Sequence, residues 1–184
     1  MVERGLEMSD TEAETKTIEK YNRVLVVDDE IALLQNIQDI LEGQKIGFAQ
    51  AENAAQALEL LQNEKFDVIV CDIQMPKMNG LRFLETIRHK GDSTPVVFFS
   101  GFYESEMLKD AMKLGAYDFI EKPLEEAHLL STLNNATEYG LIQRQMAGIT
   151  DETDSKTKKT MNEFKNKINQ LRVIKYSALQ PARK

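Results

Sequence analysis

Cysteine is nearly missing from this chain of 184 residues, which contains one, Cys71. A single cysteine excludes an internal disulfide and any zinc site built mainly from cysteines. Cys71 lies within a run of apolar residues, so we interpret it as a small core residue rather than as a nucleophile.

Long apolar runs are missing too. No stretch approaches the roughly 18 to 20 residues that a membrane-spanning helix needs, so we expect no membrane partner. The first residues lack the basic and then apolar segments of a secretory signal, and we therefore expect a cytoplasmic protein. The hydrophobic share of 42% and the charged share of 29% are ordinary for a soluble globular protein.

Positive charge is scarce in most of the chain and abundant near its end. The formal net charge is -7, with 14 basic and 26 acidic residues over 1–150 but 9 basic and 4 acidic residues over 151–184. Such a distribution concerns binding partners rather than the fold. The change near residue 150 indicates a boundary in the chain.

The length and composition predict one domain with appendages, since a domain commonly takes about 100 to 150 residues. We predict a flexible N-terminal arm over residues 1–20, because this polar segment has little to bury. The domain is expected at 21–146, followed by a linker at 147–155. An amphipathic basic helix over 156–176 and a frayed tail over 177–184 complete the chain.

Short apolar segments alternate with amphipathic segments along the predicted domain. Continuous apolar runs bounded by turn residues are typical of strands that are buried on both faces of a parallel sheet. Five strands alternating with five helices predict an α/β fold with helices on both faces of the sheet. The strands are expected at 23–27, 46–51, 66–71, 95–99 and 117–120, and the helices at 31–42, 54–61, 81–88, 105–114 and from 125 to about 141.

Polar residues follow several of these predicted strands. Asp28 and Asp29 follow the first, Asp72 the third, Ser100 the fourth and Lys122 the fifth. The carboxyl ends of parallel strands meet at one edge of the sheet, where ligands bind. Three carboxylates held together repel each other unless a cation joins them, and hard oxygen ligands suit Mg²⁺. We therefore predict a magnesium site at this edge.

The same residues suit phosphoryl chemistry. A carboxylate beside Mg²⁺, such as Asp72, can act as a nucleophile towards phosphorus and form an aspartyl phosphate. Lys122 as a point charge and the Ser100 hydroxyl as a donor can then hold phosphoryl oxygens. Simpler interpretations remain: Asp28 and Asp29 as caps of the first helix, and Asp72 and Ser100 as turn residues.

Four motifs, taken together, resemble the receiver domain of two-component response regulators, including the chemotaxis regulators. They are Val27-Asp28-Asp29-Glu30, Asp72-x-x-Met-Pro-x-Met-x-Gly80, Ser100-Gly101 and Lys122-Pro123, and the resemblance spans about residues 22–145. It implies a flavodoxin-like, doubly wound five-stranded parallel sheet with strand order 2-1-3-4-5. The C-terminal helix would be an extension of that fold.

The resemblance also implies roles for single residues. Asp72 would be the phosphoacceptor. Asp29 would be a direct Mg²⁺ ligand, with Asp28 beside it or acting through water, and the backbone carbonyl of Gln74 would be a further ligand. Ser100 and Lys122 would contact the phosphoryl group. A cis peptide is implied between Lys122 and Pro123.

A conformational switch and its partners follow from the resemblance as well. Ser100 and Phe119 would move on phosphorylation; Phe119 stands where many receivers have tyrosine, and it can equally be a plain core residue. A histidine kinase or phosphotransfer protein would supply the phosphoryl group. A downstream protein would bind the 104–140 face or the C-terminal helix, and homodimers are possible. No enzymatic activity is expected beyond phosphorylation and dephosphorylation of Asp72.

Two other functions compete with this interpretation. A transcription regulator could bind DNA through the basic helix over 156–176, whose apolar stripe is Met161, Phe164, Ile168 and Leu171. Thirty-four residues cannot hold a helix-turn-helix module with its own core, so this reading is not favoured. A Mg²⁺-dependent phosphohydrolase would need a second acid or base. We interpret His89 and His128 as surface residues.

Overall fold

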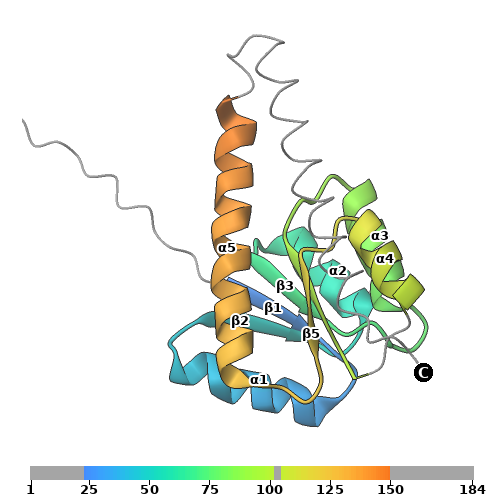
Figure 1. The fold of residues 1–184 in the computed structure, drawn as a ribbon, viewed down its shortest axis with the longest axis vertical. Coiled ribbons are helices and arrows are strands. Elements are labelled where there is room, and N and C mark those ends of the chain that lie inside the picture. Colours follow the sequence, from blue (N-terminus) through green and yellow to red (C-terminus); the bar gives the residue numbers. More distant parts are fainter. Residues whose placement is uncertain (1–22, 102–104, 150–184) are drawn as a thin grey trace, which may run out of the picture.

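The computed structural model describes residues 23–101 and 105–149, in which strands and helices alternate strictly (Figure 1). The strands are β1 (Arg23–Val27), β2 (Gly47–Ala51), β3 (Val68–Cys71), β4 (Val96–Ser100) and β5 (Asp118–Glu121). The helices are α1 (Ile31–Gly43), α2 (Ala54–Asn63), α3 (Gly80–His89), α4 (Ser105–Lys113) and α5 (Glu126–Ile149).

The five strands form one parallel sheet in the order β2-β1-β3-β4-β5, which confirms the predicted fold class. The strand order reverses at β1, which pairs with β2 on one side and β3 on the other. Val27 of β1 lies opposite Cys71 of β3. Asp28 and Asp72 therefore leave neighbouring strands at the same level, at a switch point of the kind where ligands bind in open α/β sheets.

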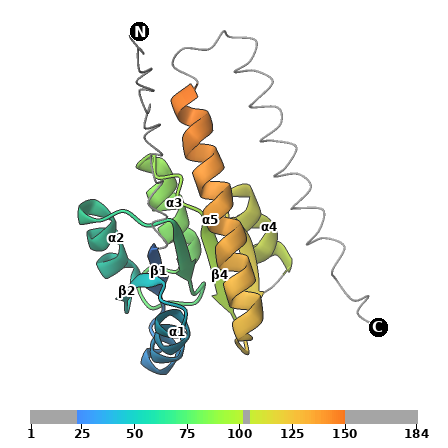
Figure 2. The ribbon, with the colours of Figure 1, turned by 90° about the vertical axis from the view of Figure 1, so that its left-hand side faces the viewer.

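Alternate residues of each strand enter two separate cores, because successive side chains of a strand point to opposite faces. Leu25 and Val27 face a core shared with α2, α3 and α4. Val24 and Val26 face a core shared with α1 and α5. The helices consequently cover both faces of the sheet (Figure 2).

Asparagine side chains cap the first turns of α2 and α3. Asn53 caps α2 by accepting a hydrogen bond from the Gln56 N–H at 3.0 Å. Asn79 caps α3 in the same way. Gly43 is the last residue of α1, and the left-handed conformation falls on Lys45, with φ of 57°.

The length of α5 corrects the predicted linker. The helix runs to Ile149, through Gly148 and into the 147–155 segment that the sequence suggested was non-helical. A single glycine in a helix costs only about 1 kcal/mol, which the rest of a 24-residue helix can absorb. The last turns of α5 project beyond the sheet (Figure 1).

Several predictions fall outside the described residues: the arm at 1–20, most of the linker, the basic helix at 156–176 and the tail at 177–184. Within the described residues, no helix combines the length and the apolar character that crossing a bilayer requires.

Candidate functional site

The carboxylates of Asp28 and Asp72 lie side by side at the carboxyl edge of the sheet. The backbone N–H of Asp72 donates to the Val27 carbonyl at 2.8 Å, and that of Asp28 donates to the Ala51 carbonyl at 3.1 Å. These bonds continue the pattern of the sheet one residue past the strands. Both side chains are buried, with 2% of Asp28 and 6% of Asp72 exposed.

A third carboxylate completes an acidic cluster. Asp28, Asp29 and Asp72 each offer an oxygen within 4.8 Å of the others, and Asp29 is exposed to solvent. Hard carboxylate oxygens with a solvent-facing side fit Mg²⁺, which keeps several of its waters when bound to protein. The donor set thus fits the predicted metal.

Lys122 brings an ammonium group into this acidic cluster. Its Nζ lies 3.1 Å from Asp28 Oδ2 and 3.8 Å from Asp72 Oδ1. It also lies 5.2 Å from the centre of the Phe99 ring, which supports it from β4. The Lys122 N–H donates to the Ser100 carbonyl at 3.0 Å, and the Lys122–Pro123 peptide is cis.

Burial makes the two inner carboxylates hard to ionise. Burial raises the pKa of Asp72 above its usual value; the neighbouring Lys122 lowers it in part, and the charge of Asp28 raises it further. The pKa of Asp28 is also raised, by burial first, against a hydrogen bond from the Glu30 N–H. A divalent cation here would favour the ionised forms of both groups.

The Asp72 carboxylate has a defined orientation. Its Oδ2 accepts a hydrogen bond from the Gln74 N–H at 3.0 Å, while Oδ1 is the oxygen nearest to Lys122. Gln74 itself is exposed, two residues beyond Asp72. Asp72 therefore stabilises a turn, as the simpler interpretation predicts. Its carboxylate also faces Lys122 and the other carboxylates.

Gly80 permits the close packing of α3 beneath the phosphoacceptor candidate. A Cβ at this position would lie 2.3 Å from the Asp72 carbonyl oxygen and 2.9 Å from the Phe98 ring. The Gly80 N–H donates to the Ile73 carbonyl at 2.9 Å. The lack of space for a side chain thus explains why the Asp72 motif has a glycine at this position.

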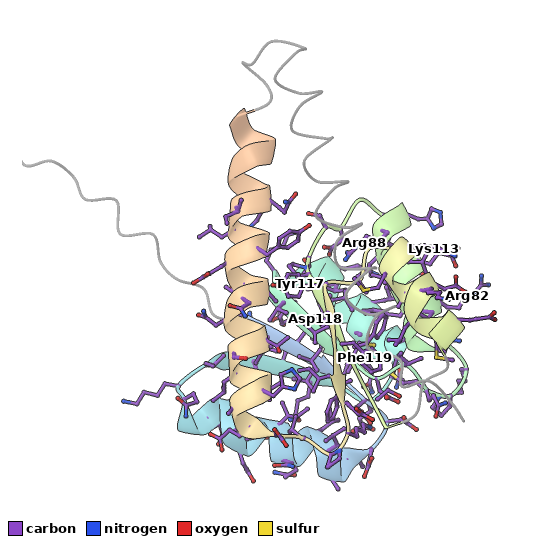
Figure 3. The ribbon with its side chains drawn as sticks, in the orientation of Figure 1. Arg82, Arg88, Lys113, Tyr117, Asp118 and Phe119 are labelled. Carbon is purple, nitrogen blue, oxygen red and sulfur yellow. The ribbon has the colours of Figure 1, made fainter. Side chains whose placement is uncertain are left out.

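Ser100 and Phe119, the predicted switch residues, stand on neighbouring strands. Ser100 ends β4 and is buried, opposite Glu121 of β5. Phe119 lies opposite Phe98 and is 8% exposed, within the core on the side of α3 and α4 (Figure 3). Its packing agrees with the simpler core interpretation, and the switch stays a prediction.

Glu30 also lies at the site, although its position in the sequence did not assign it there. Its Oε2 lies 3.8 Å from Lys122 Nζ, so this lysine faces three different carboxylates. The acidic run of Asp28, Asp29 and Glu30 was the available signal. Glu30 occupies the N-cap position of α1 without a side-chain capping bond, so neither Asp28 nor Asp29 is the cap of that helix.

Comparison with known families identifies the domain. A family model described as the response regulator receiver domain matches residues 24–134. The chain belongs to this family. It therefore carries a receiver domain, the phosphorelay module of two-component signal transduction, and receiver domains bind Mg²⁺ at an acidic pocket of this kind.

Individual relatives agree with this assignment. The chain is 36% identical over 116 residues to the chemotaxis protein CheY of Bacillus subtilis, covering 61% of this chain and 95% of that protein. It is 34% identical over 113 residues to the transcriptional regulatory protein ZraR of Escherichia coli, covering 61% of this chain but only 26% of the relative. The match thus spans about a quarter of that regulator.

A solved receiver structure has the same fold. The signal receiver domain of an HD domain-containing protein from Pseudomonas fluorescens is 26% identical and superposes with a TM-score of 0.67, covering 72% of this chain and 98% of that one. The family match ends at residue 134, within α5.

Proposed function

We propose that this receiver domain accepts a phosphoryl group on Asp72 from a histidine kinase or a phosphotransfer protein. One observation carries the proposal: the Asp72 carboxylate lies 3.8 Å from the Lys122 ammonium and within 4.8 Å of Asp28 and Asp29 oxygens. A nucleophilic carboxylate, a positive charge and a cation-binding set thus share one edge of the sheet.

The acidic cluster would hold Mg²⁺ through Asp28, Asp29 and Asp72, with the backbone carbonyl of Gln74 as a further ligand. When bound, the metal would neutralise charge on the phosphoryl group during its transfer. The protein contributes by holding its own groups in place. The Gln74 N–H fixes the orientation of the Asp72 carboxylate. Burial shields the Asp28 side chain from bulk solvent.

In the transfer step, a carboxylate oxygen of Asp72 attacks the phosphorus of a phosphohistidine. The new O–P bond forms while the N–P bond breaks, and the departing imidazole nitrogen takes up a proton from solvent. Lys122 then pairs with a phosphoryl oxygen as a point charge. The Ser100 hydroxyl donates to another, which draws the end of β4 towards the acylphosphate.

The same movement would change partner binding. Ser100 and Phe119 lie on β4 and β5, next to α4 and α5, so a shift of either side chain alters the surface of these elements. We assign the output to this 104–140 face or to the C-terminal segment 156–176, acting on a downstream protein or on a second copy of the chain.

Phosphorylation of the full chain by a small phosphodonor tests the proposal. Acetyl phosphate with Mg²⁺ should add one phosphoryl group per chain, detected by intact mass, and EDTA should prevent it. Asp72→Asn should remove the signal, whereas Asp39→Asn, at an exposed position of α1, should retain it. Labelling that persists in Asp72→Asn would refute the assignment, and multiple turnovers of phosphoesters would indicate a hydrolase.

The basic tail supports a second candidate, DNA binding, because residues 151–184 carry nine basic and four acidic side chains. Binding of duplex DNA that weakens steeply with salt and is lost on truncation after residue 150 would favour it. ZraR is named as a transcriptional regulator, but this chain corresponds to only 26% of that protein.

A further inference from the structure

The described part of the chain has a cavity at the opposite edge of the sheet from Asp72. Its volume is about 880 Å³, and it lies among α2, α3, α5 and the amino ends of the strands. Its apolar lining includes Leu58 and Leu61 of α2, Phe66 before β3, and Ile87 of α3. The two leucines are half-buried, so apolar surface is accessible there. A cavity of this size can hold several side chains.

The rim of this cavity is more basic than the rest of the domain. Its basic side chains are Arg23, Lys65, Lys90 and Arg144, and its acidic side chains are Glu64, Asp67 and Asp92. Arg144 pairs with Asp67 at 2.8 Å, and Arg23 pairs with Glu64. Lys65 and Lys90 are exposed, and no ion pair engages either of them among the described residues. The rim therefore offers two lysines to an acidic binding partner.

The segment before Arg23 is an acidic part of this same chain, and it ends at the rim of the cavity. Arg23 both lines the cavity and begins β1, so the residues before it enter the fold at the rim. Residues 1–22 carry six acidic and three basic side chains, the opposite balance to the rim. Tyr21 and Ile18 stand two and five residues before Arg23. An extended chain spans at most about 3.3 to 3.6 Å per residue, so Ile18 lies within about 18 Å of Arg23.

We propose that residues 1–22, the N-terminal arm with its two following residues, bind back into this cavity, with Ile18 and Tyr21 against the apolar lining and the acidic side chains of the arm near Lys65 and Lys90. The covalent connection at Arg23 makes the binding intramolecular, with an effective concentration far above that of a free partner. The basic C-terminal segment is disfavoured as the occupant, because its charge has the same sign as that of the rim.

Binding of the arm would join three helices at the end of the domain remote from the phosphorylation site. Gly140 of α5 packs closely on Pro95, where a Cβ would lie 3.0 Å from the proline ring, and Arg144 one turn later pairs with Asp67. The arm would then contact α2, α3 and this part of α5 together. It acts as a strap over the long helix that leads out of the domain.

Hydrogen exchange of the full chain measures the contact. Amides at 58–66 and 87–94 should exchange more slowly in the natural chain than in the variant Ile18→Asp/Tyr21→Asp, by roughly fivefold or more at the cavity and unchanged in β3 and β4. The matched control Leu6→Asp/Met8→Asp changes two apolar residues further along the arm and should leave the protection intact.

A variant in the cavity lining tests the same contact from the other side. Leu61→Glu changes a half-buried residue of α2 and should remove the protection that depends on the arm while the thermal transition stays cooperative. Equal exchange in the natural chain and in Ile18→Asp/Tyr21→Asp overturns the proposal. So does protection that disappears on truncation after residue 150, which would make the C-terminal segment the occupant, or protection that rises with protein concentration, which would indicate a second copy.

Discussion

Asp72 and Asp28 are carboxylates that the fold buries next to each other, and this has a consequence for stability. Their pKa values in the folded protein are raised above the usual 3.8, by burial first. Between 3.8 and the raised values, the folded protein binds more protons than the unfolded chain. Stability contributed by the protonated groups is present below pH 3.8 and is lost as pH rises through the folded pKa values.

Asp72→Asn should therefore stabilise the metal-free protein at pH 7. Removing one buried charge from the cluster leaves Lys122 paired with Asp28, and replacing buried charges is commonly neutral or stabilising by about 1 kcal/mol or more. Urea unfolding in EDTA at pH 5 and pH 7 measures this, with Asp39→Asn as the control. A destabilised Asp72→Asn protein at pH 7 would contradict the expectation.

Gly80 offers a steric prediction at the same scale. Gly80→Ala places a Cβ 2.3 Å from the Asp72 carbonyl oxygen, so α3 or the Asp72 backbone must move. Such overpacking costs about 1 to 3 kcal/mol. Unfolding measured by circular dichroism should show this loss, together with slower labelling of Asp72. Gly43→Ala, with no atom within 4 Å of the added Cβ, should cost nothing, and an equal loss in both variants would refute the steric explanation.

At the scale of elements, Arg88 connects α3 to the turn between α4 and β5. Its guanidinium donates to the Asp92 carbonyl at 2.8 Å and to the Gly115 carbonyl at 3.0 Å. Burial lowers the pKa of Arg88, against the charge of Asp92. Gly115 has φ of 87°, and the turn that ends α4 presents its carbonyl to this arginine.

Arg88→Met should destabilise the domain by about 2 to 3 kcal/mol, because charged hydrogen bonds to two carbonyls are lost. Arg82→Met is the matched control on the same helix. The Arg82 side chain is 74% exposed and pairs only with Glu85 at 3.2 Å among the described residues, so its loss should cost under about 0.5 kcal/mol. Thermal unfolding of both variants measures these losses of stability. Similar losses in the two variants would show that the hydrogen bonds of Arg88 contribute little.

At the scale of the whole molecule, the receiver should fold without the basic C-terminal segment. Among the described residues, the apolar side chains that α5 buries in the core are Leu129, Leu133 and Ala136, all before residue 150. Truncation after residue 150 should leave a cooperative thermal transition and labelling of Asp72 within about twofold, because the domain keeps its core. Truncation after residue 124 removes those core residues and should abolish folding. Loss of Asp72 labelling after the first truncation would show that residues 151–184 contribute to the phosphorylation site.

The fold was predictable because its signals are local. The apolar runs that end in Asp28 and Asp72 are strands buried on both faces, and that pattern alone indicates a parallel sheet. The end of α5 was predicted too early, because a single glycine, Gly148, does not by itself end a long helix. The approach of Glu30 to Lys122 joins residues far apart in the chain and depends on the register from β1 through β3 and β4 to β5.

By itself, the sequence determined which segments are strands and which polar residues follow them, because these features depend on patterns only a few residues long. It also determined the acidic body and the basic end of the chain. Only the tertiary structure decided that Lys122 faces three carboxylates, that Arg88 joins α3 to the turn before β5, and that a cavity lies beside Arg23. Those features are distances between remote residues, and they are set by strand register and by how side chains fill the space between elements.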